Sequence, residues 1–342
     1  MDRPLRDHDY FETSDDWIFC VIGDVHPPGR VFSFLKYIPG EGPWRYSGKT
    51  YRRVIGIYSV EELLRTMELI RTTRPEYLYY DETVSETITA PPASSIRRAF
   101  YPEAAARRIL NDGPSSVLES IAAELIITLS ENSGVSPSRF GVTGSLLLGN
   151  HHEESDIDLL VYGQEEFWRV MDVIDSLSRS GALRLFRDLT VDDWVSRASR
   201  KYPLLGLEDI RALSRRVMNK GFYRGRKFSI YGVRQSPIHR YGEVTYHPIG
   251  SVRGVFEVKS KLEAGFTPAI YLVEENEYGV DRIVTYDMML ACMFRPGDIV
   301  EASGKLEYAV RRGGESWRQL LVGSFRNAGK EYIKLLRPSG YS

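Results

Sequence analysis

Two carboxylates stand one residue apart at the head of an apolar run, Asp156 and Asp158 in the segment DIDLLVYG. Such a run is typical of a buried strand, and residues two apart on a strand point to the same face. Two carboxylates on one face repel each other, which costs stability unless a cation lies between them. Oxygen ligands without a nearby cysteine favour Mg²⁺ or Mn²⁺, the ions that bridge nucleotide phosphates. We therefore predict a site for one of these ions at Asp156 and Asp158.

A glycine and a serine precede this pair along the chain. Gly144 and Ser145 end the predicted strand RFGVTG and open a short turn, which Gly149 stops. Glycine lets the backbone approach a ligand closely, and N–H groups at a helix start bind phosphate oxygens. The Ser145 hydroxyl adds a further hydrogen bond. The segment therefore predicts a phosphate-binding turn followed ten residues later by a metal site, as nucleotidyl transfer requires.

The Gly-Ser pair, the ten-residue spacing and the Asp-x-Asp triplet resemble the active-site motif of the DNA polymerase beta-like nucleotidyltransferase superfamily. The chain as a whole resembles an archaeal group of predicted nucleotidyltransferases. The resemblance implies that Gly144 and Ser145 hold a nucleoside triphosphate, and that Asp156 and Asp158 bind the catalytic metals. It implies transfer of a nucleoside monophosphate from ATP or another triphosphate to an acceptor hydroxyl, with pyrophosphate released. An acidic turn before a buried strand, the simpler alternative, does not explain the Gly-Ser pair.

The same superfamily uses a third carboxylate, on a neighbouring strand, to activate the attacking hydroxyl. In this sequence the later strand KFSIYGV offers Ser229 where an acid is expected. Asp188 and Glu243 are not predicted to lie within a strand, and Glu153 and Glu154 belong to a loop. A catalytically weak or inactive module that binds a nucleotide or RNA is therefore the alternative hypothesis.

A basic stretch with interleaved aromatic residues, 207–228, is a candidate for binding a polyanion. We predict a helix that ends at Gly221, with Arg215 and Arg216 as candidate nucleotide-binding residues. Such a patch suits a triphosphate tail or the backbone of an RNA acceptor, with bases stacked on the aromatic rings. A solvated helix face is the alternative for each of these residues.

The elements that must position these motifs fall into three blocks. Residues 1–100 are predicted to form a mixed α/β module, and residues 101–240 a core with the pattern helix–strand–turn–strand–helix. Residues 245–342 show recurring short strands separated by turn residues, which favours a small β-barrel-like domain similar to an OB fold. With the resemblance, this predicts an α+β fold in which a nucleotidyltransferase core is flanked by the other two modules.

The composition limits the classes of protein to which the chain can belong. Its 342 residues carry a net charge of −1, which gives no overall attraction to nucleic acid or to a membrane surface. No apolar stretch approaches the roughly 20 residues of a membrane helix, and the N-terminus lacks the pattern of a signal peptide. Two distant cysteines, Cys20 and Cys292, favour a reducing compartment. We expect a cytoplasmic protein whose partners are a nucleoside triphosphate and an acceptor such as RNA.

Overall fold

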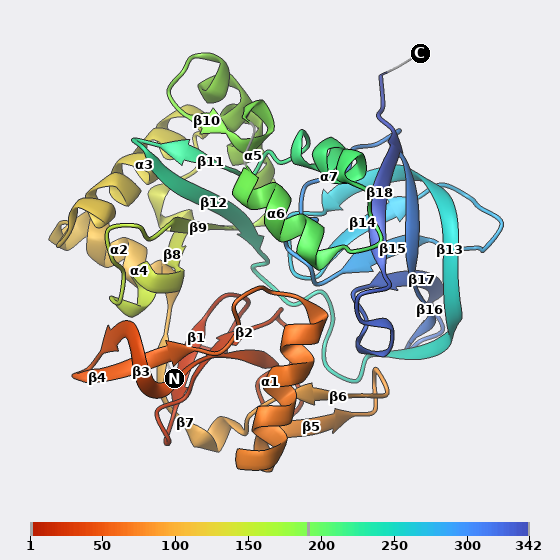
Figure 1. The fold of residues 1–342 in the computed structure, drawn as a ribbon, viewed down its shortest axis with the longest axis horizontal. Helices are drawn as coiled ribbons and strands as arrows, with labels where there is room; N and C mark the ends of the chain where they lie inside the picture. The colour runs from red at the N-terminus through yellow and green to blue at the C-terminus, as the bar shows by residue number, and fades with distance from the viewer. Residues whose placement is uncertain (1–2, 190–191, 341–342) are drawn as a thin grey trace.

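The computed structural model describes residues 3–189 and 192–340, and Figure 1 shows an N-terminal part, a core and a C-terminal part in contact with one another. Helices and several separate sheets make up these parts, so the predicted α+β fold class is confirmed. The domain limits at 1–100, 101–240 and 245–342 stay predictions. Among the described residues, no helix combines the length and the apolar composition that crossing a lipid bilayer requires.

An antiparallel sheet of five strands organises the N-terminal part, in the order β4-β3-β2-β1-β7. The elements of this part are β1 (Tyr10–Thr13), β2 (Ile18–Val21), β3 (Ser33–Tyr46), β4 (Lys49–Arg53), α1 (Val60–Thr73), the hairpin β5 (Leu78–Asp81) and β6 (Glu86–Thr89), and β7 (Ile96–Phe100). Ser59 caps the N-terminus of α1, because its side chain accepts a hydrogen bond from the Glu62 N–H, and the helix packs against one face of the sheet. The opposite face, which includes Tyr10 and Cys20, packs against Leu148 of the core. The sheet is therefore a layer between α1 and the core.

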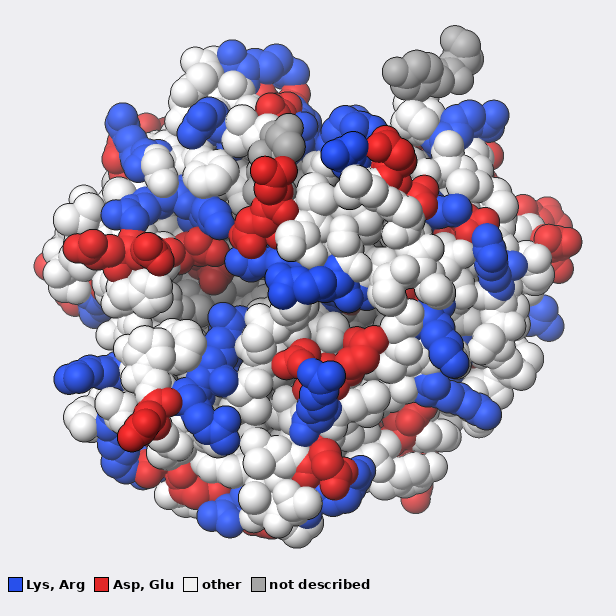
Figure 2. All heavy atoms as spheres, viewed as in Figure 1, with Lys and Arg blue, Asp and Glu red and all other residues white. Residues whose placement is uncertain are grey.

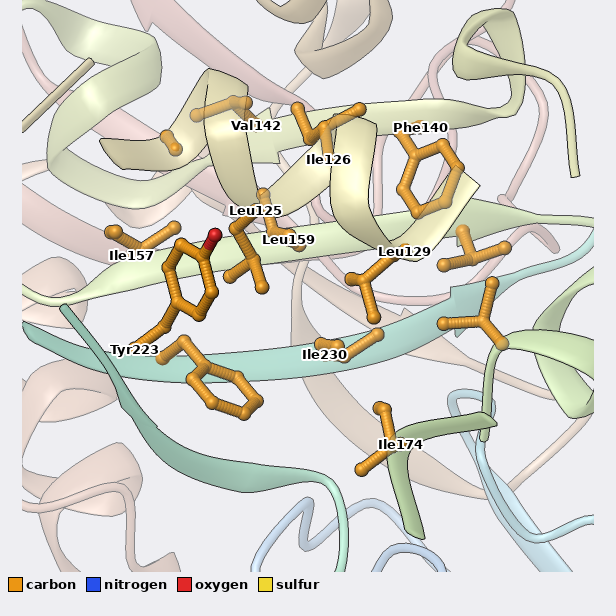
Figure 3. Close-up of a cluster of buried hydrophobic side chains, with 14 of the residues drawn as sticks. Leu125, Ile126, Leu129, Phe140, Val142, Ile157, Leu159, Ile174, Tyr223 and Ile230 are labelled. Atoms are coloured by element: carbon orange, nitrogen blue, oxygen red, sulfur yellow. The ribbon is translucent and has the colours of Figure 1, made fainter. Parts of the chain in front are cut away.

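A mixed sheet of five strands, β10-β11-β12-β9-β8, forms the centre of the core. The core elements are α2 (Pro102–Asp112), α3 (Val117–Ser133), β8 (Phe140–Thr143), α4 (Gly144–Leu148), β9 (Ile157–Tyr162), α5 (Gln164–Arg179), β10 (Arg184–Leu185), α6 (Asp192–Lys201), α7 (Leu207–Ser214), β11 (Lys220–Tyr223) and β12 (Arg226–Val233). Strand β9 pairs parallel with β12 and antiparallel with β8. Ile157 and Leu159 of β9 join the apolar side chains of α3 and α5 on one face of the sheet (Figure 3). Because neighbouring residues of a strand alternate between faces, Asp158 lies on the other face.

The predicted helix ending at Gly221 is wrong, because residues Lys220–Tyr223 form strand β11. Strands β11 and β12 are joined by the two-residue turn Arg224-Gly225, whose φ angles are +49° and +77°. Two positive φ angles are the mark of a type I′ turn, which suits hairpins because its twist matches that of the strands. The preference of this turn for a hairpin therefore prevails over the helical spacing of the preceding residues, and the helix ends at Ser214.

The C-terminal strands close into a ring, because β13 pairs with both β14 and β16. The ring runs β13-β14-β15-β17-β16. Strand β17 pairs with residues 305–310 of β16, and β18 pairs with residues 299–303 of the same strand. The strands are β13 (Val244–Glu263), β14 (Ala269–Val273), β15 (Arg282–Thr285), β16 (Ile299–Arg311), β17 (Ser316–Val322) and β18 (Tyr332–Arg337). Apolar side chains from these strands share one buried cluster, as expected when the inward positions of a small barrel are filled. The recurring short strands expected in this part are therefore present and close into a ring, and the likeness to an OB fold stays a prediction.

One aromatic side chain ties the C-terminal strands to the core. Phe266, just after β13, is fully buried and packs edge-on against Phe167 of α5, with ring centroids 5.4 Å apart. The Arg234 guanidinium lies 5.1 Å from the centroid of the Phe266 ring. A Cβ on Gly232 would lie 2.5 Å from the same ring, so glycine leaves the room that Phe266 needs. Phe266 therefore anchors one part of the chain in the apolar interior of another.

Replacing Phe266 by alanine should lower the free energy of unfolding by about 3–5 kcal/mol, because a buried ring is lost and a cavity remains. Urea unfolding followed by tryptophan fluorescence measures this loss. Phe266→Leu keeps much of the buried volume and serves as the control, with a smaller expected loss. Equal stability of Phe266→Ala and the unchanged protein would contradict the anchoring role.

Candidate functional site

Gly144 and Asp158 meet where β8 ends and β9 begins. Gly144 is the first residue of α4, and its φ angle of +68° lies in the left-handed region that favours glycine. A Cβ built on Gly144 would lie only 2.7 Å from Asp158 Oδ2. Any larger residue at this position would therefore displace the carboxylate or the turn. The fold brings the backbone of the glycine directly against the second aspartate of the motif.

A row of four residues crosses the core sheet at the level of Asp158. Thr143 of β8, Asp158 of β9, Ser229 of β12 and Lys220 of β11 are successive partners in the strand register. Ser229 Oγ donates a hydrogen bond of 2.5 Å to Asp158 Oδ1. A hydroxyl therefore stands at the neighbouring-strand position where the superfamily resemblance implies a third carboxylate, and a lysine follows one strand further on.

The other candidate acids lie apart from this row. Asp188 follows β10 and accepts a hydrogen bond of 3.0 Å from the Ser178 hydroxyl. Glu243 stands just before β13 and accepts a hydrogen bond of 2.9 Å from the Arg240 N–H. Glu153 and Glu154 are exposed loop residues. Among the described residues, no three or more His, Cys, Asp or Glu side chains gather in a way that could hold a metal. The candidate metal ligands are therefore the two aspartates of the motif.

Asp156 lies in an environment that disfavours its charged form. Although the side chain has exposed surface, desolvation by the surrounding protein, followed by the charge of Asp158, raises the pKa of Asp156 to about 6. Lys227, Arg197 and Lys220 act in the opposite direction and do not cancel these effects. A cation between the carboxylates would favour the charged form. Mg²⁺ commonly binds through one or two carboxylates and completes its coordination with phosphate oxygens and water, so the two aspartates fit such an ion.

A cavity of about 300 Å³ lies beside Gly144 and Asp158. All three parts of the chain contribute to its walls, and three lysines line it: Lys36 of β3, Lys201 of α6 and Lys220 of β11. Figure 2 shows Lys and Arg side chains gathered across the middle of one face of the molecule, next to a hollow in the surface. The cavity therefore brings Gly144 and Asp158 of the motif together with three lysines, and Asp156 is not among its lining residues.

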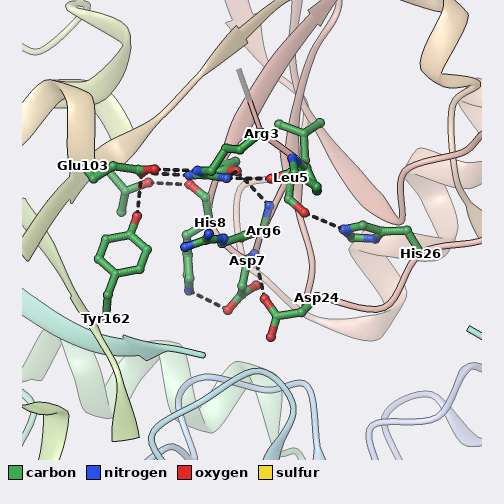
Figure 4. Close-up of polar contacts among 12 residues, drawn as sticks. Arg3, Leu5, Arg6, Asp7, His8, Asp24, His26, Glu103 and Tyr162 are labelled. Atoms are coloured by element: carbon green, nitrogen blue, oxygen red, sulfur yellow. Dashed lines mark hydrogen bonds and ion pairs between the residues drawn. The ribbon is translucent and has the colours of Figure 1, made fainter. Parts of the chain in front are cut away.

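The start of the chain closes one side of this region. Arg3 forms ion pairs with Asp9 and with Glu103 of α2, at 2.6 and 2.5 Å (Figure 4). In the same segment, the ring of His8 stacks on Tyr231 of β12, with centroids 5.5 Å apart. Tyr231 lies on the face of the core sheet that carries Asp158, because it is two residues from Ser229. The N-terminal part is thus fixed against the site-bearing face of the core.

The structure keeps the four motif residues together at the ends of β8 and β9, with Ser145 next to Gly144 in α4. It does not bring Arg215 and Arg216 to the cavity. Arg215 is an exposed residue just past α7, and Arg216 forms an ion pair with the buried Asp298 of the C-terminal part. Arg216 therefore connects the core with the C-terminal strands, and its position gives no support to a role in nucleotide binding.

Most other charges of the basic stretch are also engaged within the chain. The contacts are those of Arg211 with Glu208, Arg224 with Glu124, Lys227 with Asp193, and Arg226 with the Glu153 carbonyl. Lys220 is the member of the stretch that lines the cavity. Of the basic residues in the predicted polyanion-binding stretch, Lys220 is therefore the one that the structure places at the cavity.

Sequence reasoning missed three basic residues near the motif: Lys36, Arg197 and Lys201. No local pattern marks Lys36, because only the fold brings the N-terminal sheet to the cavity. Arg197 and Lys201 are four residues apart in α6 and therefore share one helix face. That spacing is a signal that a helix-by-helix analysis of charge would have found.

The raised pKa of Asp156 predicts a pH-dependent stability. The native state holds the proton more tightly than the unfolded chain, so stability should fall as the pH rises from about 4 to about 6. Asp156→Asn removes the penalty and should melt at a higher temperature than the unchanged protein above this range, with no difference below it. Thermal melts in metal-free buffer measure the effect, and Asp172→Asn, at an exposed position of α5, is the control. A lower melting temperature for Asp156→Asn at neutral pH would show that the carboxylate is structural.

Comparison with known proteins bears on the same residues. Residues 123–205 match the model of the nucleotidyltransferase domain family, and this segment contains Gly144, Ser145, Asp156 and Asp158. An uncharacterized protein of the archaeon Methanocaldococcus jannaschii is 27% identical, over 97% of this chain and 99% of its own length. No solved structure matches the chain. The resemblance expected from the motif is therefore confirmed: the chain carries a nucleotidyltransferase domain at residues 123–205 and has an archaeal relative along nearly its whole length.

Proposed function

We propose that the protein is a metal-dependent nucleotidyltransferase that moves a nucleoside monophosphate from ATP or another triphosphate to an acceptor hydroxyl. The observation that carries the proposal is the close approach of Gly144 to Asp158, inside the segment that matches the nucleotidyltransferase domain. This approach puts backbone that is open to a phosphate next to a carboxylate suited to Mg²⁺ or Mn²⁺. The family match supports a transferase of this general kind, and the metal, the substrate and the turnover are the proposed part.

Each motif residue has a separate task in this proposal. Asp156 and Asp158 hold the cation, which when bound would neutralise phosphate charge and orient the triphosphate. The left-handed turn at Gly144 lets the Asp158 carboxylate lie against the backbone, next to the N–H groups at the start of α4 that would bind a phosphate. The Ser145 hydroxyl donates a hydrogen bond to a phosphate oxygen. The motif thus binds and orients the triphosphate.

Two further members of the row, Ser229 and Lys220, support the residues that bind the reacting phosphate. Ser229 fixes the orientation of the Asp158 carboxylate through their hydrogen bond. Lys220 lies beside Ser229 and places positive charge near the charge that develops during transfer. The acceptor oxygen forms a bond to the α-phosphorus while the bond from that phosphorus to the bridging oxygen breaks, and pyrophosphate leaves. The proton of the acceptor hydroxyl passes to water, because a serine hydroxyl is not a base at neutral pH.

A second candidate function is a nucleotide- or RNA-binding module without turnover, and Ser229 is the observation that favours it. A carboxylate next to Asp158 would accept the proton of the attacking hydroxyl, and general-base catalysis of this kind contributes about a hundredfold or more to a rate. The hydroxyl of Ser229 donates its hydrogen bond to Asp158 instead. Binding of the triphosphate and the metal needs only the motif, so it is compatible with either function.

Transfer is tested by incubating the protein with each α-labelled nucleoside triphosphate, Mg²⁺ or Mn²⁺, and separate RNA, protein and small-molecule acceptors. We expect the label to appear on one class of acceptor, with pyrophosphate released, only when the divalent cation is present. Asp158→Asn should abolish transfer and weaken metal-dependent triphosphate binding, whereas Asp172→Asn should change neither. Metal-dependent binding without transfer would favour the binding module. A protein that binds neither a triphosphate nor RNA would contradict both functions.

Ser229→Asp tests the hydroxyl in the row directly, because it supplies a carboxylate beside Asp158. If this hydroxyl limits turnover, the variant should raise kcat roughly a hundredfold and leave the triphosphate dissociation constant nearly unchanged. Lys220 on the adjacent strand offsets part of the added negative charge. Ser229→Ala removes the hydroxyl without adding an acid and should not raise kcat. A folded Ser229→Asp variant without any gain would show that another step limits turnover.

A further inference from the structure

Lys36 is a buried cation whose charge no acid of the described chain balances. The residue is 9% exposed, and its ammonium lies 4.9, 5.8 and 5.9 Å from the ring centroids of Tyr10, Tyr37 and Tyr58. Its hydrogen bond is to the Tyr10 hydroxyl, and no carboxylate in residues 3–189 or 192–340 forms an ion pair with it. Burying an ammonium without an opposite charge is costly. An anion from outside the chain would supply the missing charge.

A β-bulge lies at Lys36. The register of β2 and β3 shifts between Ile18 and Phe19, and this shift leaves Lys36 without a partner on β2. Bulges are frequent next to active sites. Lys36 lines the cavity beside Gly144 together with Tyr10 and with Phe34, which stands two residues before it in β3. Lys36 therefore lies on the face of the N-terminal sheet that is turned to the site.

A second unbalanced cation lies close to Lys36. The Arg53 guanidinium is 5.1 Å from the centroid of Tyr58, the ring that also lies near the Lys36 ammonium. Its buried Nε has no hydrogen-bond partner, and among the described residues no carboxylate pairs with it. By contrast, Lys201 on another wall of the same cavity pairs with Asp287 at 2.6 Å. Lys36 is therefore the lysine on the N-terminal wall that lacks an acid of the described chain in contact with it, although Asp7 and Glu61 line the same cavity, and Arg53 adds positive charge behind that wall.

We propose that this N-terminal wall binds the acceptor, and that the acceptor is a small molecule whose phosphate or carboxylate group contacts Lys36. The inference rests on the proposed function, in which the triphosphate takes the part of the cavity lined by Gly144 and Asp158. A cavity of about 300 Å³ enclosed by three parts of the chain suits a small molecule. An RNA acceptor would need a free basic surface to follow its backbone, and most charges of residues 207–228 are paired within the chain.

Lys36→Met tests the anion contact, because methionine keeps a long side chain in the buried sheet and removes only the charge. Lys49→Met is the matched control, an exposed lysine of the same sheet that pairs with Asp16 at 2.5 Å. Inorganic phosphate and acetate are titrated separately by calorimetry at constant ionic strength, with and without ATP. We expect Lys36→Met to bind at least one of these anions about tenfold or more weakly than Lys49→Met. We expect both variants to bind ATP equally well.

Two results would overturn the inference. Equal affinity of Lys36→Met and Lys49→Met for both anions would show that Lys36 holds no anion. Weaker ATP binding by Lys36→Met would place Lys36 on the triphosphate and not on the acceptor. Circular dichroism spectra and melting temperatures establish that both variants are folded.

The identity of the acceptor is tested in the transfer assay with the full-length protein. We expect label on small hydroxyl compounds that carry a phosphate or carboxylate, and a higher KM for them in Lys36→Met. Transfer to an RNA oligomer in preference to these compounds would overturn the inference while leaving nucleotidyl transfer intact. A protein that binds no triphosphate would instead refute the proposed function. The anion titrations would still show whether Lys36 binds an anion, because they can be carried out without ATP.

Discussion

The backbone of Gly144 and the carboxylate of Asp158 share a space that one additional carbon atom would fill, and the rest of the site is arranged around this approach. Strand β8 must end in a left-handed residue, and β9 must enter the sheet with Asp158 opposite Thr143. Both strands are held from the far side by the apolar side chains of α3 and α5. The packing that makes the core stable therefore also fixes the distance between the candidate phosphate-binding turn and a candidate metal ligand.

The charged residues around the cavity come from different parts of the chain. The core supplies Asp158, Lys201 of α6 and Lys220 of β11, whereas Lys36 comes from the N-terminal sheet. The segment that matches the nucleotidyltransferase domain ends at residue 205, before Lys220 and Ser229. The family motif therefore describes only part of the electrostatic environment of the site. Contacts such as the Arg3 ion pairs and the Phe266 anchor matter for the site because they hold the other walls in place.

The features that follow from short stretches of sequence were predictable, and those that depend on distant partners were not. The motif residues, and Ser229 at the place of a third acid, were identified because strand alternation and spacing are local properties. Lys36 was missed because the other walls of its cavity come from two other parts of the chain. Arg216 was read as free charge because its partner, Asp298, lies far along the sequence. The helix predicted through Gly221 failed because the turn at Arg224 and Gly225 favours a hairpin.

A hairpin with only two turn residues fixes the register in which its two strands pair. One residue more or fewer in the turn between β11 and β12 would shift the pairing by one position and exchange the two faces of β11. The ammonium of Lys220 would then point into the apolar layer, and the ring of Tyr223 would leave the buried cluster that it now completes. The length of this turn, and not only the identity of residue 220, decides whether a lysine in the sequence becomes a positive charge beside Asp158.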